Sequence, residues 1–407
     1  MAGKRKKIDE KELLHMKHVR RAGELFSELR KVGCERDMGN SRKLFFNDYC
    51  SWILFYAMNP AIDSARMLQA SSKLKRVQNL LRINRFSTGA FSEAPEAFEP
   101  DKLKPIIARL AARVTAKGVD KKLEELQYAV QLTDSTLLRT LPGLVCTRYN
   151  QRKDGEDYHA WRVHMEFEVG MPAATRATVT GVRKGGDERK TLKRRVRQGC
   201  CYVMDRGYHD VSLFNRIHEH DSRYVCRVRD FANYNVVKEL PLSPQQVAEG
   251  IISDQIVLVG QRRTEPPTHR VRLVIVKAEV HPKRTKKGVK PSSGRILLLS
   301  NLTAKEAPAE LVGLLYRYRW TIELFFRFLK QVQGMNHLLG HSKKAVQIFV
   351  YCMVICCLLL YLWTGVVPNK QITLMIHWYQ TGLASLDELM SAVEHERQKT
   401  SRSKTTV

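Results

Sequence analysis

Apolar and polar positions along the chain follow two different spacings, and the change from one to the other separates two kinds of structure. Up to about residue 115, apolar residues recur at intervals of three and four, which predicts short helices. From residue 128 onward a spacing of two becomes common, most clearly in residues 161–169, as in a half-buried strand. Strands are predicted at residues 128–132, 161–169, 176–180, 200–204 and 223–228, with helices at 187–198 and 211–218. Helices interleaved with strands indicate an α/β sheet, whose first three strands form a meander.

The second half of the chain begins with an interrupted β-rich segment. Residues 230–300 contain short apolar runs separated by basic, proline-containing turns, and they are expected to be inserted between two parts of one α/β domain. A helix is then predicted over residues 310–332, because its Leu, Ile and Phe residues form one broad apolar face. Residues beyond 396 are rich in Ser, Thr and Lys and are expected to be disordered.

One apolar run challenges the picture of a soluble protein. Residues 348–363 are sixteen residues without a charge, and four more uncharged residues extend the run to twenty before Pro368. By length this run is a borderline membrane span. It directly follows an amphipathic helix that needs an apolar neighbour. We therefore expect a fully buried helix that covers the apolar face of residues 310–332, with a membrane span as the alternative.

Composition adds a candidate partner. The 407 residues include 69 Lys plus Arg and 41 Asp plus Glu, which gives a net charge of +28. Hydrophobic residues make up 43% of the chain, enough for a core, so wholesale disorder is excluded. The excess positive charge is clustered and favours a polyanionic partner, nucleic acid first, with solubility alone as the alternative. The clusters lie at residues 4–7, 17–21, 189–197 and 283–295.

The cysteines and the N-terminal region limit the cellular context. Nine cysteines, an odd number, include no C-x-x-C pair, which argues against a disulfide framework and a zinc ribbon and fits a reducing cytosol. No apolar stretch follows the basic residues at the N-terminus, so no secretory signal is predicted. Residues 82–88 carry two arginines and two hydroxyls where a helix-turn-helix recognition helix could begin; an ordinary helical region is the alternative.

Candidate chemistry begins on the helix predicted over residues 310–332. Tyr316, Arg319, Glu323 and Lys330 fall within about 60° on a helical wheel, beside the apolar face. This arrangement holds a carboxylate between cations and a tyrosine on a half-buried helix. The alternative is a solvated face with an i,i+4 pair of Arg319 and Glu323, which contributes only about 0.2–0.5 kcal/mol.

Two aspartates lie at the ends of predicted strands. Asp134 follows the first strand and Asp205 ends the fourth, where an α/β sheet presents its crevice and where carboxylates are placed to share a cation. Each has a simpler alternative, with Asp134 as a turn or helix-capping residue and Asp205 as a turn residue before Gly207. His164, on the second predicted strand, could face the same site, but a core histidine is favoured.

Three motifs in this order resemble those of bacterial insertion-sequence transposases of the insertion sequence 4 family. The spacing formed by Tyr316, Arg319, Glu323 and Lys330 matches that family's Y-x2-R-x3-E-x6-K signature position by position. Thr133-Asp134-Ser135-Thr136 resembles the family's first acidic motif. Asp205-Arg206-Gly207-Tyr208 resembles its second. The resemblance covers roughly residues 125–365.

The resemblance implies a ribonuclease H-like catalytic core with a triad of Asp134, Asp205 and Glu323 and a β-rich insertion before the glutamate. It implies that these carboxylates bind two Mg²⁺ ions, with Mn²⁺ as a substitute, because hard cations require oxygen ligands. The ions would serve DNA strand cleavage and strand transfer. The side chains that would contact DNA near the cleaved phosphate are Tyr316, Arg319, Lys330 and, as a further candidate, Arg206.

One difference from the family concerns cleavage of the second DNA strand. Some relatives cut it through a hairpin and stack a flipped base on a tryptophan of the β insertion, whereas residues 230–300 contain no tryptophan. Base stacking near the start of the insertion would have to use Phe231 or Tyr234. The sequence therefore offers no direct counterpart for the hairpin route.

The patterns and the resemblance together predict a cytoplasmic, nucleoid-associated DNA transposase. Its expected partners are the terminal inverted repeats of its element and target DNA, bound as a homodimer assembled on DNA, with no membrane. The predicted division is 1–115, a basic helical DNA-binding domain; 116–229 and 301–366, the two parts of the core; 230–300, the β-rich insertion; and 367–407, a C-terminal helix and disordered tail. The alternatives are a metal-dependent nuclease that does not join DNA, a non-catalytic DNA-binding protein and a membrane-attached DNA-binding protein.

Overall fold

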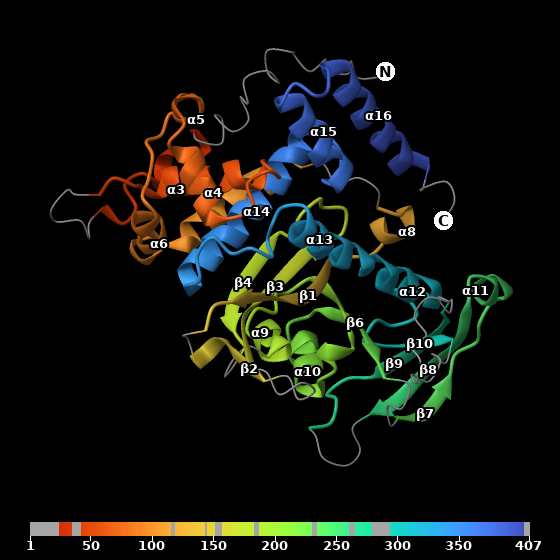
Figure 1. Ribbon diagram of the computed structural model, residues 1–407. Helices are drawn as coiled ribbons and strands as arrows, with labels where there is room; N and C mark the ends of the chain where they lie inside the picture. Colours follow the sequence, from red (N-terminus) through yellow and green to blue (C-terminus); the bar gives the residue numbers. More distant parts are fainter. Residues whose placement is uncertain are drawn as a thin grey trace.

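Helices pack on both faces of one large mixed β-sheet, and the N-terminal and C-terminal helices gather beyond one of these faces (Figure 1). The structure is a computed structural model. It describes residues 24–34, 42–114, 119–142, 145–150, 157–182, 187–229, 234–259, 265–278 and 294–402. The predictions for residues 4–7, 17–21, 283–293 and 403–407 and for Phe231 lie outside the described residues.

Ten strands of the described chain form a single sheet in the order β2-β3-β1-β5-β6-β10-β9-β8-β7, with β4 paired to β3. They are β1 (Ala129–Thr140), β2 (Arg148–Asn150), β3 (Asp157–Glu168), β4 (Arg176–Gly181), β5 (Cys200–Met204), β6 (Arg223–Val228), β7 (Tyr234–Glu239), β8 (Ile251–Val259), β9 (Val271–Lys277) and β10 (Arg295–Ser300). Strands β1, β3 and β4 pair antiparallel, and β1, β5 and β6 pair parallel. The predicted α/β sheet with an initial meander is therefore confirmed.

The β-rich insertion extends this sheet. β10 pairs antiparallel with β6, from Leu297 opposite Val228 to Ser300 opposite Val225. β9, β8 and β7 follow outward from β10. The segment between the two parts of the core is β-rich, and its strands join the core sheet edge to edge. β10 covers an edge of β6 whose backbone groups would otherwise lack strand partners.

β1 is longer than its apolar run predicts. The run ends at Leu132, but β1 continues through Asp134 to Thr140, because its antiparallel pairing with β3 persists to that residue. Asp134 therefore lies within a strand, and its interpretation as a residue after a strand, a turn residue or a helix cap is wrong. Pairing with parallel β5, by contrast, stops at Thr133 opposite Met204.

Helices cover the two faces of the sheet in two groups (Figure 1). One face carries α9 (Glu188–Lys193) and α10 (Val211–Glu219), and the other carries α12 (Ala309–Tyr318), α13 (Trp320–Gln331) and α14 (Lys343–Thr364). Successive strand side chains alternate between these faces. In β5, Tyr202 and Met204 belong to the core cluster with α10, whereas Cys201 and Val203 belong to the cluster with α12 to α14. The helix predicted over 187–198 ends earlier, at Lys193.

The N-terminal region is helical where the structure describes it. Its helices are α3 (Phe46–Ala57), α4 (Ala65–Ser72), α5 (Lys75–Leu81), α6 (Thr88–Ala97) and α7 (Lys104–Ala111). Their buried side chains share one hydrophobic cluster with α14 and one face of the sheet. Arg82 ends α5 with a positive φ of 55°, and Arg85 precedes Ser87, which caps α6. Neither arginine lies on a helix, and the role of this region in DNA binding stays a prediction.

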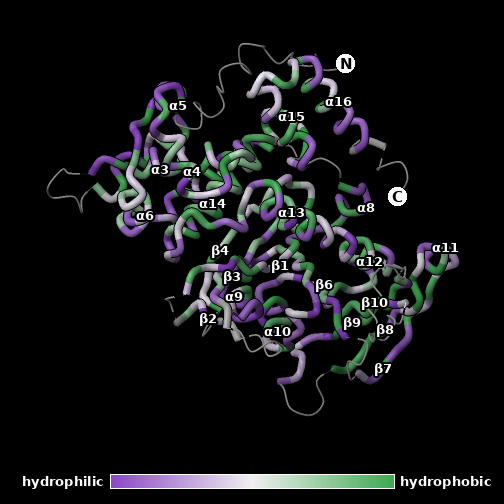
Figure 2. Tube along the Cα trace, viewed as in Figure 1, coloured by the Kyte–Doolittle hydropathy of each residue, from purple (hydrophilic) through white to green (hydrophobic). Residues whose placement is uncertain are grey.

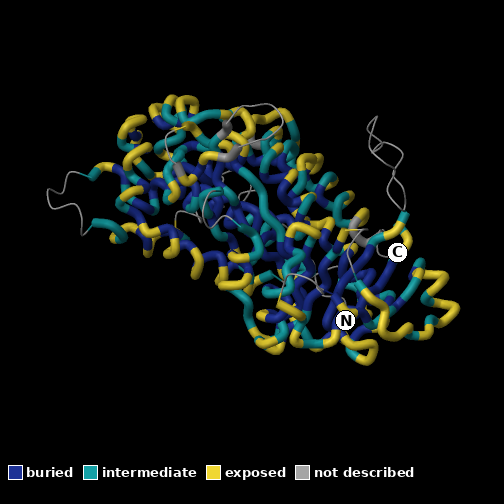
Figure 3. The backbone as a smooth tube through the Cα atoms, turned by 90° about the horizontal axis from the view of Figure 1, so that it is seen from below, coloured by how far each residue is buried: buried dark blue, intermediate teal, exposed yellow. Residues whose placement is uncertain are grey.

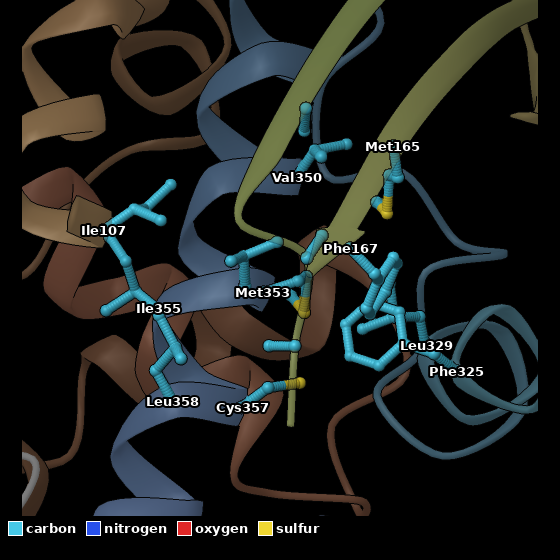
Figure 4. Packing of buried hydrophobic residues seen from close by; sticks show 14 of the residues in the cluster. Ile107, Met165, Phe167, Phe325, Leu329, Val350, Met353, Ile355, Cys357 and Leu358 are labelled. Atoms are coloured by element: carbon cyan, nitrogen blue, oxygen red, sulfur yellow. The ribbon is translucent and has the colours of Figure 1, made fainter. Parts of the chain in front are cut away.

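The apolar run at residues 348–363 forms an interior helix. α14 packs mainly against α3, α7 and β4 rather than along α13, so its predicted cover of the α13 face is limited. Met353 and Cys357 do join Phe325 and Leu329 around Phe167 (Figure 4). α14 is the one described helix long and apolar enough to cross a membrane, and 83% of its most apolar window is buried inside the structure. The prediction of a buried helix is confirmed.

Hydropathy and burial agree on this position. α14 is coloured mostly toward the hydrophobic end of the scale, whereas the C-terminal α16 is mostly hydrophilic (Figure 2). Buried residues fill the middle of the molecule and exposed ones its periphery (Figure 3). The length of α14 therefore serves the protein core.

Truncating a side chain of α14 tests this interior position. Met353 is fully buried, so Met353→Ala is expected to lower the free energy of unfolding by about 2–5 kcal/mol. Leu383 is 77% exposed, and Leu383→Ala is expected to change it by less than about 0.5 kcal/mol. Urea unfolding without detergent measures both. Equal stability of Met353→Ala and the wild type would contradict the interior packing of α14.

The remaining helices are short or C-terminal. They are α8 (Lys121–Glu124), α11 (Pro244–Ala248), α15 (Lys370–Gln380) and α16 (Leu386–Arg402). The disorder predicted beyond residue 396 is wrong for residues 397–402, which belong to α16. Arg397 anchors this helix, because its Nε donates to the backbone carbonyl of Thr364 at 3.0 Å.

Candidate active site

Asp134 and Asp205 lie next to each other on neighbouring parallel strands. Thr133 and Met204 form the last registered pair of β1 and β5, and the two aspartates are the next residues of the chain after them. Neighbouring strands are about 4.8 Å apart. The residues two positions earlier belong to the core cluster with α12 and α13, so alternation assigns both carboxylates to that face. β5 ends at this point while β1 continues, so the two carboxylates lie side by side where the pairing of these strands ends.

Asp134 lies in a partly buried, negatively charged environment. Burial raises the pKa of Asp134 to about 6; the backbone N–H of Ser135 and the charge of Arg319 lower it, and the charges of Asp205 and Glu188 raise it. The Ser135 N–H donates to Asp134 Oδ1 at 2.7 Å. The cost of burying this carboxylate thus exceeds the stabilisation that Ser135 and Arg319 give its charged form.

Asp205 combines a turn role with its place beside Asp134. Its Oδ1 accepts the backbone N–H of Arg206 at 2.5 Å, which caps the short 3-10 turn η5 (Arg206–Tyr208). The turn interpretation is therefore correct for its local backbone. It leaves the second carboxylate oxygen available, because this bond uses only one. The Arg206 side chain is exposed beside this carboxylate.

Arg319 connects the aspartates to the helix that carries Glu323. Its Nη1 lies 3.5 Å from Asp134 Oδ2, and its Nη2 donates to Glu323 Oε1. The guanidinium carbon lies 5.5 Å from the centre of the Tyr316 ring. Burial lowers the pKa of Arg319, but Tyr316, Glu323 and Asp205 outweigh it and raise that pKa. Arg319 therefore stays cationic and bridges β1 and α13.

The helix predicted over residues 310–332 breaks at this arginine. α12 ends at Tyr318 and α13 begins at Trp320. Around the break, two backbone hydrogen bonds reach three residues back. The Arg319 N–H donates to the Tyr316 carbonyl at 3.1 Å, and the Ile322 N–H donates to the Arg319 carbonyl at 3.2 Å. The prediction of one regular helix is wrong here. The tighter turn lies where Arg319 reaches Asp134.

The remaining predicted DNA-contacting residues take different positions. Tyr316 is buried, and burial raises its pKa, partly opposed by the charge of Arg319. Lys330 is half-buried about 10 Å further along α13 than Glu323, and burial lowers its pKa. In the described part of the chain no acidic residue pairs with Lys330. The structure thus brings Tyr316, Arg319 and Glu323 to the aspartates and leaves Lys330 at a distance.

Sequence reasoning missed a fourth acidic residue beside this site. Glu188, the first residue of α9, accepts hydrogen bonds from Ser135 Oγ and Arg162 Nη1. Its charge contributes to the raised pKa of Asp134. A signal was present, because Asp187 and Glu188 are the only acidic residues between Glu168 and Asp205. The basic residues that follow them concealed it.

His164 is a core residue, as favoured from the sequence. It is 3% exposed, and its Nε2 lies 2.9 Å from Thr180 Oγ1. Burial lowers the pKa of His164 to about 3, aided by the charges of Arg162 and Arg195. His164 pairs with Ser135 in the ladder, so it shares the α9 face of the sheet and lies on the face opposite Asp134.

The side chains at this site provide only some of the oxygen ligands that a hard cation needs. Asp134 and Asp205 supply neighbouring carboxylate oxygens, the ligands that Mg²⁺ and Mn²⁺ prefer, and burial raises the pKa of Asp134 because its charged form is only partly stabilised by the protein. Among the described residues, however, no group of three His, Cys, Asp or Glu is arranged to hold a metal ion. Glu323 is instead held by Arg319. The two aspartates fit a hard cation, while the Glu323 carboxylate is occupied by its ion pair with Arg319.

The sheet and the acidic residues described above lie in a part of the chain that matches a known protein family. Residues 125–360 match the family described as "Transposase DDE domain", more than half of the chain, so the protein belongs to this family.

Two curated relatives are similar over part of their length. "Putative transposase y4zB" of Sinorhizobium fredii is 28% identical over 165 residues, which are 39% of this chain and 41% of that protein. "Probable transposase for insertion sequence element IS5377" of Geobacillus stearothermophilus is 26% identical over 250 residues, 59% of each chain. The chain therefore spans about two fifths and three fifths of these relatives.

A solved structure is also similar. It is the piggyBac transposase synaptic complex with hairpin DNA, at a TM-score of 0.41 and 13% sequence identity, covering 97% of this chain and 81% of that one.

Proposed function

We propose that this protein is a DNA transposase of the insertion sequence 4 type. It binds the ends of its element and catalyses metal-dependent strand cleavage and strand transfer. The observation that carries the proposal is the adjacency of Asp134 and Asp205 on parallel strands, with Glu323 brought toward them by Arg319. Membership of the transposase DDE-domain family supports it.

The core of this transposase is proposed to be ribonuclease H-like. Strands β4, β3 and β1 form an antiparallel group, and β5 and β6 continue it in parallel to β1. Asp134 lies on the central strand of these five and Asp205 directly follows its parallel neighbour. Glu323 arrives from a helix on the covered face.

The three carboxylates are proposed to hold two Mg²⁺ ions, for which Mn²⁺ can substitute. Bound there, the ions would supply Lewis-acid activation of the attacking hydroxyl and charge stabilisation at the leaving oxygen. Asp134 and Asp205 provide the first oxygen ligands. Arg319, released from Glu323, would then be free to bind a DNA phosphate through its planar donor fork.

DNA is the proposed partner of the residues around the carboxylates. Arg319, Tyr316 and the exposed Arg206 lie closest to them, while Lys330 would meet the strand further along α13. Part of the basic cluster at residues 189–197 is neutralised internally, because Arg195 and Arg197 pair with buried Glu166. Lys190 and Arg194 are exposed and would bind phosphates without reading sequence.

Assembly and location complete the proposal. Two element ends must meet in one complex, so a homodimer assembled on DNA is proposed, in the cytoplasm and in association with the nucleoid. The named ligands are the terminal inverted repeats and the target DNA. Tyr234 packs against the core cluster of the α10 face, which does not favour it as a base-stacking residue for a hairpin route.

A strand-transfer assay tests the proposed function. The element ends are read from inverted repeats in the DNA that flanks the gene, and a labelled, pre-cut end is incubated with purified protein, target DNA and Mg²⁺. The expected product is the labelled end joined covalently to target DNA. Hydrolysis products alone would identify a nuclease, and metal-independent binding without any product would identify a non-catalytic DNA-binding protein.

A further inference from the structure

Glu188 connects α9 to β1, the strand that carries Asp134, and to the neighbouring strand β3. Its Oε1 accepts hydrogen bonds from Ser135 Oγ on β1 and from Arg162 Nη1 on β3. The same Nη1 lies 3.2 Å from Ser135 Oγ, so the three side chains form a closed group. The Arg162 and Glu188 side chains are 19% and 23% exposed, which shields their pairing from water. This group lies on the face of the sheet opposite Asp134.

Ser135 transmits this contact through the sheet. Its hydroxyl donates to Glu188, while its backbone N–H donates to Asp134 Oδ1 at 2.7 Å. Ser135 is thus bonded to Glu188 on one face of the sheet and to Asp134 on the other. The rotation of the Asp134 carboxylate is therefore coupled to the position of Glu188.

Glu188 also lies close to the turn that Asp205 caps. A Cβ added to Gly207 would lie 3.0 Å from Glu188 Oε2, tighter than an ordinary contact. Apart from Gly207 itself and its chain neighbours, no other atom of the described residues lies within 4 Å of that position, and Gly207 has no positive φ, so Glu188 Oε2 is the atom that limits a larger side chain here. Gly207 follows Asp205 by two residues in η5. Glu188 thus bonds Ser135, which holds Asp134, and lies close to the turn that Asp205 caps.

The start of α9 is itself fixed in place. Asp187 caps the helix by accepting the backbone N–H of Arg189 at 2.8 Å, and Arg189 Nη1 lies 3.9 Å from Asp210, the cap of α10. Glu188 therefore extends from a held helix terminus. A side chain can position its neighbours only if its own backbone is held in place.

We propose that Glu188 is a positioning residue that sets the separation and orientation of Asp134 and Asp205 for divalent-cation binding. It acts through Ser135 and Gly207 and does not touch the cation. The inference rests on the proposed metal-dependent function. Residues that orient metal ligands in this way typically change metal affinity about 10–100-fold when they are replaced.

Equilibrium binding of Mn²⁺ to the DNA-free protein, followed by electron paramagnetic resonance, tests the inference without any turnover. Glu188→Ala is expected to weaken Mn²⁺ affinity at least about tenfold. Glu188→Gln keeps an oxygen acceptor for Ser135 and is expected to recover most of that loss. The matched control is Glu310→Ala, which also removes a first-turn glutamate with one side-chain bond, to Gln246 at 2.7 Å. Its Mn²⁺ affinity should equal that of the wild type.

A double-substitution cycle tests the contact without metal. Gly207→Ala is expected to lower the urea midpoint in the wild type, because Glu188 is held by two donors and cannot yield freely. In the Glu188→Ala background the same substitution should no longer lower the midpoint and should raise it slightly, because alanine restricts the unfolded chain. Equal effects in both backgrounds would overturn the contact.

The outcomes separate the inference from the proposed function. Wild-type affinity of Glu188→Ala for Mn²⁺, together with weakened binding by Asp134→Asn, would overturn the positioning role and leave the metal site intact. A wild-type protein that binds no Mn²⁺ would contradict the proposed function and, with it, the positioning role. The cycle would then report only whether Glu188 and Gly207 are in contact.

Discussion

Asp205→Asn is expected to abolish DNA strand cleavage and strand transfer, with a loss of more than about a thousandfold, as for other groups that act as one catalytic unit. The amide keeps an oxygen that can accept the Arg206 N–H, so the turn and fold remain. What is lost is the negative charge beside Asp134. Binding of element ends should stay nearly unchanged in a mobility-shift assay, and Glu323→Gln should behave in the same way.

Asp120→Asn provides the matched control for this loss. Asp120 is also an aspartate whose side chain caps a short helix, because it accepts the N–H of Lys122 at 2.9 Å at the start of α8. The amide preserves that cap, so cleavage by Asp120→Asn should match the wild type. Cleavage retained by purified Asp205→Asn would refute the triad.

Asp134→Asn is expected to inactivate the protein and yet to stabilise it at pH 8. The pKa of Asp134 is about 6 in the folded protein against 3.8 as its ordinary value, mainly because of burial. Between these values the folded state binds more protons than the unfolded state, so wild-type stability falls as pH rises from about 4 to 6. Such a difference corresponds to at most about 3 kcal/mol, reduced by the lost contact with Arg319.

Thermal unfolding of the metal-free proteins measures this effect. Asp134→Asn should unfold at a higher temperature than the wild type at pH 8, and the gap should close at pH 4. Added Mg²⁺ should stabilise the wild type and not the variant, because a ligand that binds only the folded state raises its stability. Equal or lower stability of Asp134→Asn at pH 8 would contradict a net cost of burying the charged Asp134 carboxylate.

Asp187, whose pKa is lowered and not raised, serves as the control. Hydrogen bonding from Arg189 lowers the pKa of Asp187 to about 2, despite partial burial. Its contribution to stability is present above its ordinary pKa of 3.8 and is lost as pH falls toward 2. Asp187→Asn should therefore destabilise the protein at pH 8, the reverse of Asp134→Asn.

The part of the fold that the sequence predicts best is the part governed by local patterns. β5 and β6 have the predicted bounds, and α10 ends within a residue of its prediction, because short apolar runs between turn residues mark them clearly. The polar end of β1 was missed, because its hydrogen bonds come from β3, about thirty residues away in the chain. The pairing of β10 with β6 was missed for the same reason.

The candidate site shows the same limit. The spacing of Tyr316, Arg319 and Glu323 predicts their shared surface, and the structure places all three at the aspartates. The break at Arg319 and the contact of Glu188 with Ser135 depend on tertiary packing. Neither the break nor this contact can be predicted from a helical wheel or from strand alternation.

Anomalous diffraction from a Mn²⁺-loaded crystal tests the central claim most directly, because it locates the metal without reference to activity. The account predicts Mn²⁺ bound by carboxylate oxygens of Asp134 and Asp205, with Glu323 turned toward the ion and Arg319 no longer paired with it. Mn²⁺ at another site, or Mn²⁺ absent from these carboxylates at saturating concentration, would contradict the account.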